Sequence, residues 1–280
     1  MNTEIKKIDI YLSESVLNNE TLYQEFPNYE PDKIESKIGI RNRHIASENE
    51  TALDLAQKAS EKVLEGYDKN KIDFLILCTQ SPDYYLPTSA CILQEKLGLK
   101  TTVGAFDFNL GCSGFIYGLA ISKGLIKAGI ANNILLVMTE TYTKHINPKD
   151  FANRSIFGDG AAAIIIEKSD EEHIWEFVLG TDGKGMNNLI IPNGGMRKKY
   201  APNAELKTDD SGNQRTENDL YMNGPEIFNF TIKSVPSLVN KTIEKNNLKF
   251  EDIDYFIFHQ ANKYMLDYLR KKIKIPEEKF

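Results

Sequence analysis

The sequence feature that most constrains the fold is a pair of similar segments far apart in the chain, Ile72–Thr79 and Ile253–Gln260. Each opens on Ile-Asp, continues as an apolar run and closes on polar residues, which is typical of a strand buried on both faces. An amphipathic helix is predicted before each segment, at about 51–66 and about 225–246. The pattern favours a duplicated α/β chain, although helix-turn-strand units recur in all α/β proteins and so short a match can arise by chance.

The two similar segments are followed by different numbers of predicted helices and strands. After the first segment we expect a helix at 89–97, a strand at 104–109, a long helix after Cys112, and strands at 133–139 and 161–167. After the second segment only one helix, at 262–273, precedes Phe280. We therefore expect an N-terminal half at 1–170 and an incomplete second half at 171–280. The polar stretch 193–218 indicates a long surface excursion.

Composition excludes several classes of protein. The 280 residues are 41% hydrophobic and 26% charged, with no apolar window long enough to cross a membrane. The first residues lack the apolar core of a signal peptide, so we expect a cytoplasmic protein. A net charge of -6 argues against a general nucleic-acid binder. The three cysteines, Cys78, Cys91 and Cys112, are an odd number at no metal-ligand spacing, so neither a disulfide framework nor a metal site is predicted.

Cys112 is the leading candidate nucleophile. It stands in the run Gly111–Phe115, where a strand pattern ends and a long apolar helix pattern begins. A thiol at a helix start faces unpaired backbone N–H groups and the positive end of the helix dipole, which favour the reactive thiolate. The alternative is a small buried hydrophobic residue, because free cysteine is among the most buried residue types.

His259 is the candidate partner of Cys112. It ends the second predicted strand, which places it at the sheet edge where α/β proteins gather their ligands. A group that moves a proton or stabilises negative charge is what thioester chemistry needs beside a thiol. The other histidines, His44, His145 and His173, lie in polar contexts and are expected to be surface or loop residues.

Two further motifs have competing interpretations. The turn Phe157–Ala163 carries two glycines around Asp159, but a strand follows it, so a phosphate-binding loop is excluded and a role in shaping the site floor is preferred. The basic residues Lys263, Arg270, Lys271 and Lys272 lie on the helix after His259. They fit either an acidic partner or, as the simpler interpretation, a solvated helix face.

Together these motifs resemble the β-ketoacyl-acyl carrier protein synthase III family of condensing enzymes. The resemblance spans most of the chain and rests on Gly39–Ala46, Pro87–Cys91, the Cys112 run, Phe157–Gly160 and His259–Asn262, in the family's order. It implies a thiolase-like fold of two pseudo-equivalent α/β halves in five αβαβα layers, and a homodimer.

The resemblance also implies a ping-pong mechanism. Cys112 takes an acyl group from a thioester donor, malonyl-acyl carrier protein loses carbon dioxide, and the carbanion attacks the acyl-enzyme to give a β-ketoacyl thioester. His259 stabilises the thioester oxygen. Coenzyme A or carrier-protein thioesters are substrates, and no metal or bound cofactor is required. The resemblance assigns substrate binding to Leu86, Phe151, Gly224, Phe228, Asn262 and Lys37, and carrier docking to Lys263, Arg270, Lys271 and Lys272.

The chain departs from the family pattern at three places. The family's third catalytic residue, an asparagine in a Gly-Asn turn, does not occur before Phe280, so we expect a truncated form of a longer enzyme. The positions that often clamp adenine hold Lys33 and Phe151, and Leu86 replaces a phenylalanine before Pro87. These substitutions favour a carrier-bound or longer acyl donor.

Three alternatives remain open. One is an acyltransferase of the same fold that passes the acyl group to an oxygen or nitrogen acceptor. Another is a catalytically incomplete chain that binds an acyl group or a partner. A cysteine protease is the third, and the sequence around Cys112 fits it less well.

Overall fold

The computed structural model describes residues 2–28 and 31–280, without the side chains of 31–34. Contacts divide the chain into two compact units, which are described separately. Unit 1 comprises Met1–Val16, His44–Tyr142 and Asp159–Trp175, and unit 2 comprises Leu17–Arg43, Thr143–Gly158 and Glu176–Phe280. The two units therefore interleave along the sequence, whereas the two expected halves are contiguous.

Unit 1 is built on a five-stranded mixed sheet. Its strands are β1 (Asn2–Tyr11), β4 (Phe74–Cys78), β5 (Gly104–Phe108), β6 (Asn133–Glu140) and β7 (Gly160–Ser169), in the order β1-β7-β6-β4-β5. β4 runs parallel to both β5 and β6, while β7 is antiparallel to β6 and β1. The carboxyl ends of the three parallel strands therefore share one edge of the sheet.

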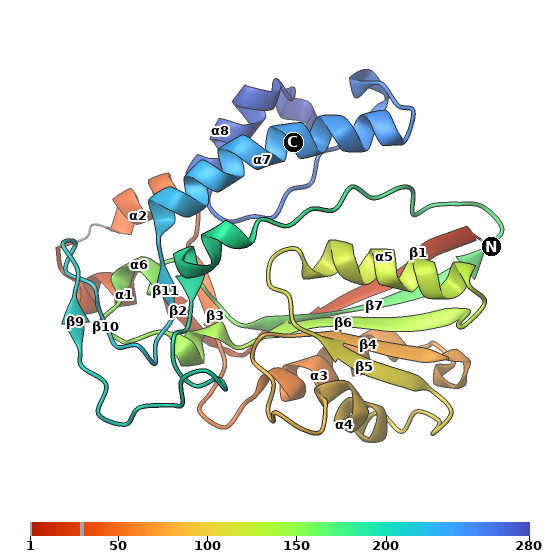
Figure 1. The fold of residues 1–280 in the computed structure, drawn as a ribbon, viewed down its shortest axis with the longest axis horizontal. Coiled ribbons are helices and arrows are strands. Elements are labelled where there is room, and N and C mark those ends of the chain that lie inside the picture. The colour runs from red at the N-terminus through yellow and green to blue at the C-terminus, as the bar shows by residue number, and fades with distance from the viewer. Residues whose placement is uncertain (1, 29–30) are drawn as a thin grey trace. The chain divides into compact units, whose positions relative to one another are not determined.

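Helices cover both faces of this sheet (Figure 1). α3 (Ala52–Leu64) and α4 (Ser89–Lys96) lie on one face, and α5 (Gly114–Lys127) lies on the other. α3 begins at Thr51 in a capping box, in which the Thr51 side chain accepts the Asp54 N–H and the Asp54 carboxylate accepts the Thr51 N–H. This layering explains why the central strands are apolar at successive positions.

The core of unit 1 confirms the first predicted strand. Leu75, Ile76 and Leu77 of β4 are all fully buried, the alternate side chains facing opposite helix layers. Each fully buried leucine or isoleucine contributes about 1.5–3 kcal/mol relative to an exposed one. Strands β5, β6 and β7 and helices α3, α4 and α5 also lie where the sequence predicts them, while the edge strand β1 was not predicted.

Helices make up most of the regular secondary structure among the described residues of unit 2. Its helices are α1 (Asn19–Glu25), α2 (Pro31–Ile38), α6 (Phe151–Arg154), α7 (Gly224–Lys245) and α8 (Lys263–Ile273). The surface excursion 193–218 contains the short pair β9 (Lys207–Thr208) with β10 (Gln214–Arg215), and the pair β8 (Leu189–Ile190) with β11 (Tyr221–Met222) flanks it. Another short pair, β2 (Ser15–Asn18) with β3 (Asn42–Ile45), lies where the chain passes between units.

The second predicted strand, Ile253–Gln260, is wrong. The segment is assigned to no strand, and Tyr255 and Ile257 are 71% and 91% exposed. The backbone N–H of Phe256 donates to the carbonyl of Lys279, and no described strand pairs with the segment. An apolar run becomes a buried strand only where neighbours supply its backbone hydrogen bonds and cover its faces.

None of the helices within the described residues is both long enough and apolar enough to cross a membrane.

Candidate active site

Polar and titratable side chains gather at the edge of unit 1 where the parallel strands end. Gln80 follows β4, Cys112 follows β5, and Glu140 is the last residue of β6. Parallel strands β5, β4 and β6 are adjacent, so these positions are brought to the same side of the sheet. The carboxyl edge of parallel strands is where α/β proteins place their ligands.

Cys112 lies in the turn between β5 and α5, as the sequence predicts. α5 begins at Gly114, and Ser113 at its N-cap makes no side-chain capping bond. The N–H of Gly114 donates to the carbonyl of Gly111 at 2.8 Å. The N–H groups that follow it receive no capping bond from the Ser113 side chain, and they point toward the turn that holds Cys112. Cys112 as a whole residue is exposed at this turn.

Two glycines let the Cys112 turn pack closely against its neighbours. A methyl group on Gly111 would lie 2.6 Å from Oε1 of Gln80, and one on Gly114 would lie 2.5 Å from Sγ of Cys78. A side chain at either position would displace these groups. The turn is therefore held in place by Gln80 on one side and by Cys78 on the other.

Glu140 is a half-buried carboxyl with two donors. The Gln80 backbone N–H donates to its Oε1 and the Ser81 hydroxyl donates to its Oε2, each at 2.7 Å. Burial raises the pKa of Glu140 to about 7, an effect strengthened by the charge of Asp159 and opposed by these two hydrogen bonds. A carboxyl whose pKa is raised by burial at the ligand-binding edge of a sheet is a candidate functional group.

The thiols at this edge resist ionisation. Cys112 is exposed as a residue, but the atoms around its sulfur desolvate the thiolate and raise the pKa of the thiol. The negative charge of Glu140 raises this pKa further, whereas a hydrogen bond from the residue's own N–H lowers it. Burial raises the pKa of Cys78 to about 11. At Cys112, desolvation therefore raises the pKa by more than the hydrogen bond from the residue's own N–H lowers it.

His259 belongs to unit 2 and lies just before α8. The Ala261 N–H donates to its carbonyl at 3.1 Å, and the Asn262 side chain accepts the Met265 N–H at 2.9 Å, which begins the helix. Desolvation of the ring lowers the pKa of His259. The imidazole is therefore neutral near pH 7 and can donate one N–H.

The other predicted substrate residues have different environments within their units. Leu86 in unit 1 is 82% exposed, Lys37 is exposed at the end of α2, and Gly224 is the first residue of α7. Phe228 on α7 packs against two aromatic rings of α8, with centroids 5.6 Å from Tyr264 and 5.3 Å from Tyr268.

Phe151 is a buried packing residue. It is 9% exposed, and its ring packs edge-on against Phe26 with centroids 5.4 Å apart. That Phe151 contacts substrate stays a prediction, and most of its side chain is covered by the protein. The side chain of Lys33, which matches the other clamp position, lies outside the described residues.

The basic residues of α8 are not equivalent. Arg270 is half-buried and donates to the carbonyl of Ile275, and Lys272 donates to the carbonyl of Ile232. Lys263 packs against Gly39, where an added methyl group would lie 2.7 Å from its Cβ. Lys271 is exposed. Arg270 and Lys272 thus make hydrogen bonds within unit 2.

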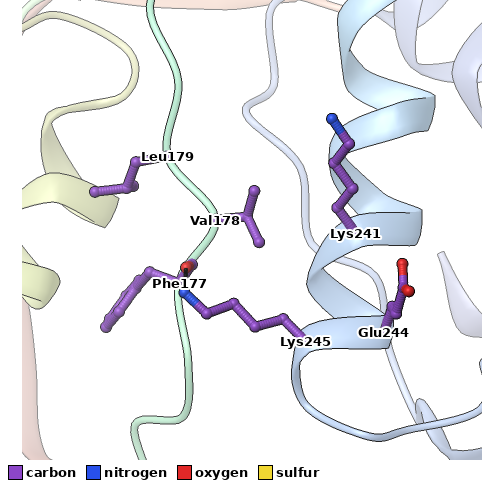
Figure 2. Close-up of a pocket in the computed structure, with 6 residues that line it drawn as sticks. All are labelled: Phe177, Val178, Leu179, Lys241, Glu244 and Lys245. Carbon is purple, nitrogen blue, oxygen red and sulfur yellow. Dashed lines mark hydrogen bonds between the residues drawn. The ribbon is translucent and has the colours of Figure 1, made fainter.

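A hollow of about 460 Å³ in unit 2 contains none of the predicted site residues. Figure 2 shows the extended segment Phe177–Leu179 facing Lys241, Glu244 and Lys245 of α7. Lys245 donates to the carbonyl of Phe177 at 2.9 Å, which ties the segment to the helix. The hollow is open and lacks a nucleophile or a histidine.

The sequence reasoning missed four polar residues of the unit 1 edge: Gln80, Ser81, Glu140 and Tyr142. A signal was present, because each follows or ends a predicted strand of the parallel set. Polar residues directly after a buried strand are placed at the ligand-binding edge by the topology alone. The sheet order was needed to bring Glu140 beside the turn after β4.

Comparison with known proteins identifies the chain. Models of 3-Oxoacyl-[acyl-carrier-protein (ACP)] synthase III and of its C-terminal region match residues 106–183 and 243–280. A β-ketoacyl-[acyl-carrier-protein] synthase III of Clostridium perfringens is 37% identical over 100% of this chain and 83% of the relative. A putative 3-oxoacyl-[acyl-carrier-protein] synthase 3 of Campylobacter jejuni is 38% identical over 88% of this chain and 70% of the relative.

A solved 3-oxoacyl-(acyl-carrier-protein) synthase III superposes with a TM-score of 0.98 at 45% identity, covering 100% of this chain and 85% of that chain. The fold and the thiol at the sheet edge thus define a thiolase-like condensing acyltransferase. The chain belongs to the 3-oxoacyl-acyl carrier protein synthase III family, whose role is in fatty acid biosynthesis.

Proposed function

We propose that Cys112 is the acyl-accepting nucleophile of a decarboxylative condensation. The observation that carries this is its position, an exposed cysteine in the turn before α5 at the carboxyl edge of the sheet, where the Ser113 side chain does not cap the helix. Sγ attacks the donor thioester, an Sγ–acyl bond forms, the donor C–S bond breaks, and the departing thiol carries away the proton of Cys112. The raised pKa of the resting thiol means that this proton must leave as the bond forms.

The second half-reaction makes the new carbon–carbon bond. Malonyl-acyl carrier protein loses carbon dioxide by cleavage of its C–C bond, and the electron pair remains as an enolate. The enolate carbon attacks the acyl carbonyl on Cys112, and the Cys112 thiolate leaves. His259, neutral near pH 7, donates its N–H to the thioester oxygen of the enolate.

Acyl carrier protein is the proposed partner, and no metal or bound redox cofactor takes part. We assign docking chiefly to Lys271 and Lys263, because Arg270 and Lys272 already bind carbonyls of unit 2. Lys271→Glu is expected to raise the KM for malonyl-carrier protein several-fold with kcat unchanged, through lost attraction to an acidic partner. Lys71→Glu, an exposed lysine of unit 1, is the matched control. Equal KM values for the two variants would place the docking surface elsewhere.

We further propose a cytoplasmic homodimer with contiguous halves at 1–170 and 171–280. An exposed apolar stretch of unit 1 supports the dimer: Tyr84, Tyr85 and Leu86 are 61%, 78% and 82% exposed. Sedimentation should give twice the monomer mass, and Tyr85→Asp with Leu86→Asp should weaken association. A monomer at micromolar concentration would contradict this.

The donor is proposed to be a carrier-bound or longer acyl thioester. The burial of Phe151 supports this, because a ring packed against Phe26 is not placed to stack on an adenine. A panel of acetyl, branched and longer acyl groups on coenzyme A and on carrier protein tests it. A strong preference for acetyl-coenzyme A would refute it.

The reaction class is tested by release of carbon dioxide from labelled malonyl-carrier protein. Wild type should release it with formation of a β-ketoacyl thioester, and Cys112→Ala should form no product. His259→Ala should keep acylation of Cys112 but lose decarboxylation. Acyl transfer to an oxygen or nitrogen acceptor without release of carbon dioxide would instead indicate an acyltransferase of the same fold. Absence of any acyl adduct on Cys112 would indicate a catalytically incomplete chain that binds an acyl group or a partner.

A further inference from the structure

Glu140 fixes the turn that follows β4. Both of its carboxylate oxygens are engaged, one by the Gln80 backbone N–H and the other by the Ser81 hydroxyl, at 2.7 Å each. The Ser81 oxygen in turn accepts the backbone N–H of Thr141 at 2.9 Å. The pairing of β4 with β6 ends at Cys78 and Met138. Beyond that point, the side chains of Glu140 and Ser81 connect the two chain segments.

The side chain of Gln80 carries this connection to the nucleophile turn. Its Nε2 donates to Oδ1 of Asn109 at 2.9 Å, just after β5, and its Oε1 accepts the hydroxyl of Tyr142. The same Oε1 lies against Gly111, the residue before Cys112, as does the Tyr142 hydroxyl. The Cα of Gly111, which carries no side chain, therefore lies against the Gln80 amide and the Tyr142 hydroxyl. Gln80 is held by Glu140, and Tyr142 is hydrogen-bonded to Gln80, so the positions of both groups depend on Glu140.

We propose that Glu140 is a positioning residue for Cys112: through Gln80 and Tyr142 it sets the place of the nucleophile turn and the reactivity of its thiol. The proposal rests on the assignment of Cys112 as the nucleophile. Glu140 acts through other residues and touches no reacting atom. Its contacts all lie within unit 1 and connect three strand ends to one turn.

The charge of Glu140 gives the proposal a measurable consequence. Asp159, Cys78, Cys112 and Tyr142 are the titratable groups that interact with it at this edge. Asp159 is buried and accepts the Ala46 N–H at 2.8 Å. The carboxylate form raises the pKa of both thiols, so protonated Glu140 eases ionisation of Cys112. The same residue therefore both holds the turn and opposes premature thiolate formation.

The test compares Glu140→Gln with Glu167→Gln. Glu167 lies on β7 of the same sheet, where it accepts the Tyr67 hydroxyl at 2.6 Å, so its variant makes an equal charge change away from the turn. The readout is the pH profile of Cys112 alkylation by iodoacetamide, with the site identified by peptide mass. Glu140→Gln keeps an acceptor for Gln80 and should move the midpoint down by about half a pH unit. Glu167→Gln should leave it in place.

Two further variants separate positioning from charge. Glu140→Ala removes the same charge and leaves the Gln80 N–H without its partner, so acylation of Cys112 should slow by about tenfold beyond Glu140→Gln. Tyr142→Phe should lower kcat with KM unchanged. Melting temperatures within a few degrees of wild type establish that the variants are folded.

The outcomes are distinct. Alkylation profiles and acylation rates equal to wild type in folded Glu140→Gln and Glu140→Ala would overturn the inference while leaving the proposed function intact. Absence of a Cys112 acyl adduct in wild type would instead overturn the proposed function. If Glu140→Ala does not fold, an unshifted Glu140→Gln profile is sufficient to refute the proposal.

Discussion

Two segments with nearly the same sequence pattern have opposite environments in this molecule. In Ile72–Thr79 the residues of β4 pair with β5 and β6, and Leu75, Ile76 and Leu77 are fully buried. In Ile253–Gln260 no strand forms, and Ile257 is 91% exposed. A pattern of apolar residues therefore shows that a segment is able to form a buried strand. Whether the strand forms depends on the neighbouring strands and helices that pair with it and cover it.

The helices beside these segments differ in the same way. α3 buries seven residues against the sheet of unit 1, among them Leu55 and Val63. None of the 22 residues of α7 is buried, although its pattern is also amphipathic. The amphipathic pattern therefore predicts both helices correctly. It does not predict how much apolar surface each helix buries.

The largest expected effect comes from truncating the equivalent positions of the two segments, Ile76 and Ile257. Ile76→Ala should lower the free energy of unfolding by about 2–5 kcal/mol, because it leaves a cavity in a fully packed core. Ile257→Ala should change it by less than about 0.5 kcal/mol, as expected for an exposed side chain. Urea denaturation followed by circular dichroism measures both. If both variants lost a similar amount of unfolding free energy, Ile257 would be buried in solution, and the proposed difference between the two segments would be contradicted.

A second effect comes from Glu172, which links β1 to α5 through hydrogen bonds to Thr3 and ion pairs with Lys123 and Lys127. Glu172 accepts both the N–H and the hydroxyl of Thr3 and lies 2.8 Å from Nζ of Lys127. Desolvation opposes ionisation of Glu172, but the contacts with Lys127, Thr3 and Lys123 outweigh it and hold its pKa at about 2. Glu172→Gln should lower the free energy of unfolding by about 1–2 kcal/mol near pH 7.

The sign of its pH dependence follows from the depressed pKa. The stabilising contribution of Glu172 is complete above the ordinary value of 4.5 and is lost as the pH falls toward 2. The difference in free energy of unfolding between wild type and Glu172→Gln should therefore shrink over that interval. A difference that stays constant down to pH 2 would mean that the carboxylate is not held by these partners. Glu171→Gln, an exposed neighbour, serves as control.

The smallest expected effects come from two helix caps, one in each unit. Thr51 accepts the Asp54 N–H at the start of α3, and Asn262 accepts the Met265 N–H at the start of α8. Replacement of either by alanine should cost about 1 kcal/mol. The Thr51 variant should cost more, because its hydroxyl also donates to Asp83 at 2.9 Å. Thermal melts of the two variants compare them, and a larger loss for Asn262→Ala would reverse the order.

Much of unit 1 could be predicted from sequence because its elements carry local signals. The buried strands are continuous apolar runs, α3 has its capping box, and the Cys112 turn lies between a strand pattern and a helix pattern. The position of Cys112 followed from these signals. The direction of its pKa did not, because desolvation depends on which atoms pack around the sulfur.

Other features depend on contacts between distant residues. β1 was missed because its apolar residues alternate with charged ones at a sheet edge, and only pairing with β7 identifies it. The role of Glu140 required the strand order, and the burial of Phe151 required its contact with Phe26. Long-range pairing decides such features, and a single sequence does not contain it.

The central claim is that Cys112 carries the acyl group, and it is tested most directly by peptide mass mapping after incubation with an acyl thioester. Cys91 is the other exposed thiol, so Cys91→Ala is the matched control for Cys112→Ala. The account predicts one acyl adduct on the Cys112 peptide in wild type and in Cys91→Ala, and none in Cys112→Ala. An adduct that persists in Cys112→Ala, or that maps to Cys91, would contradict it.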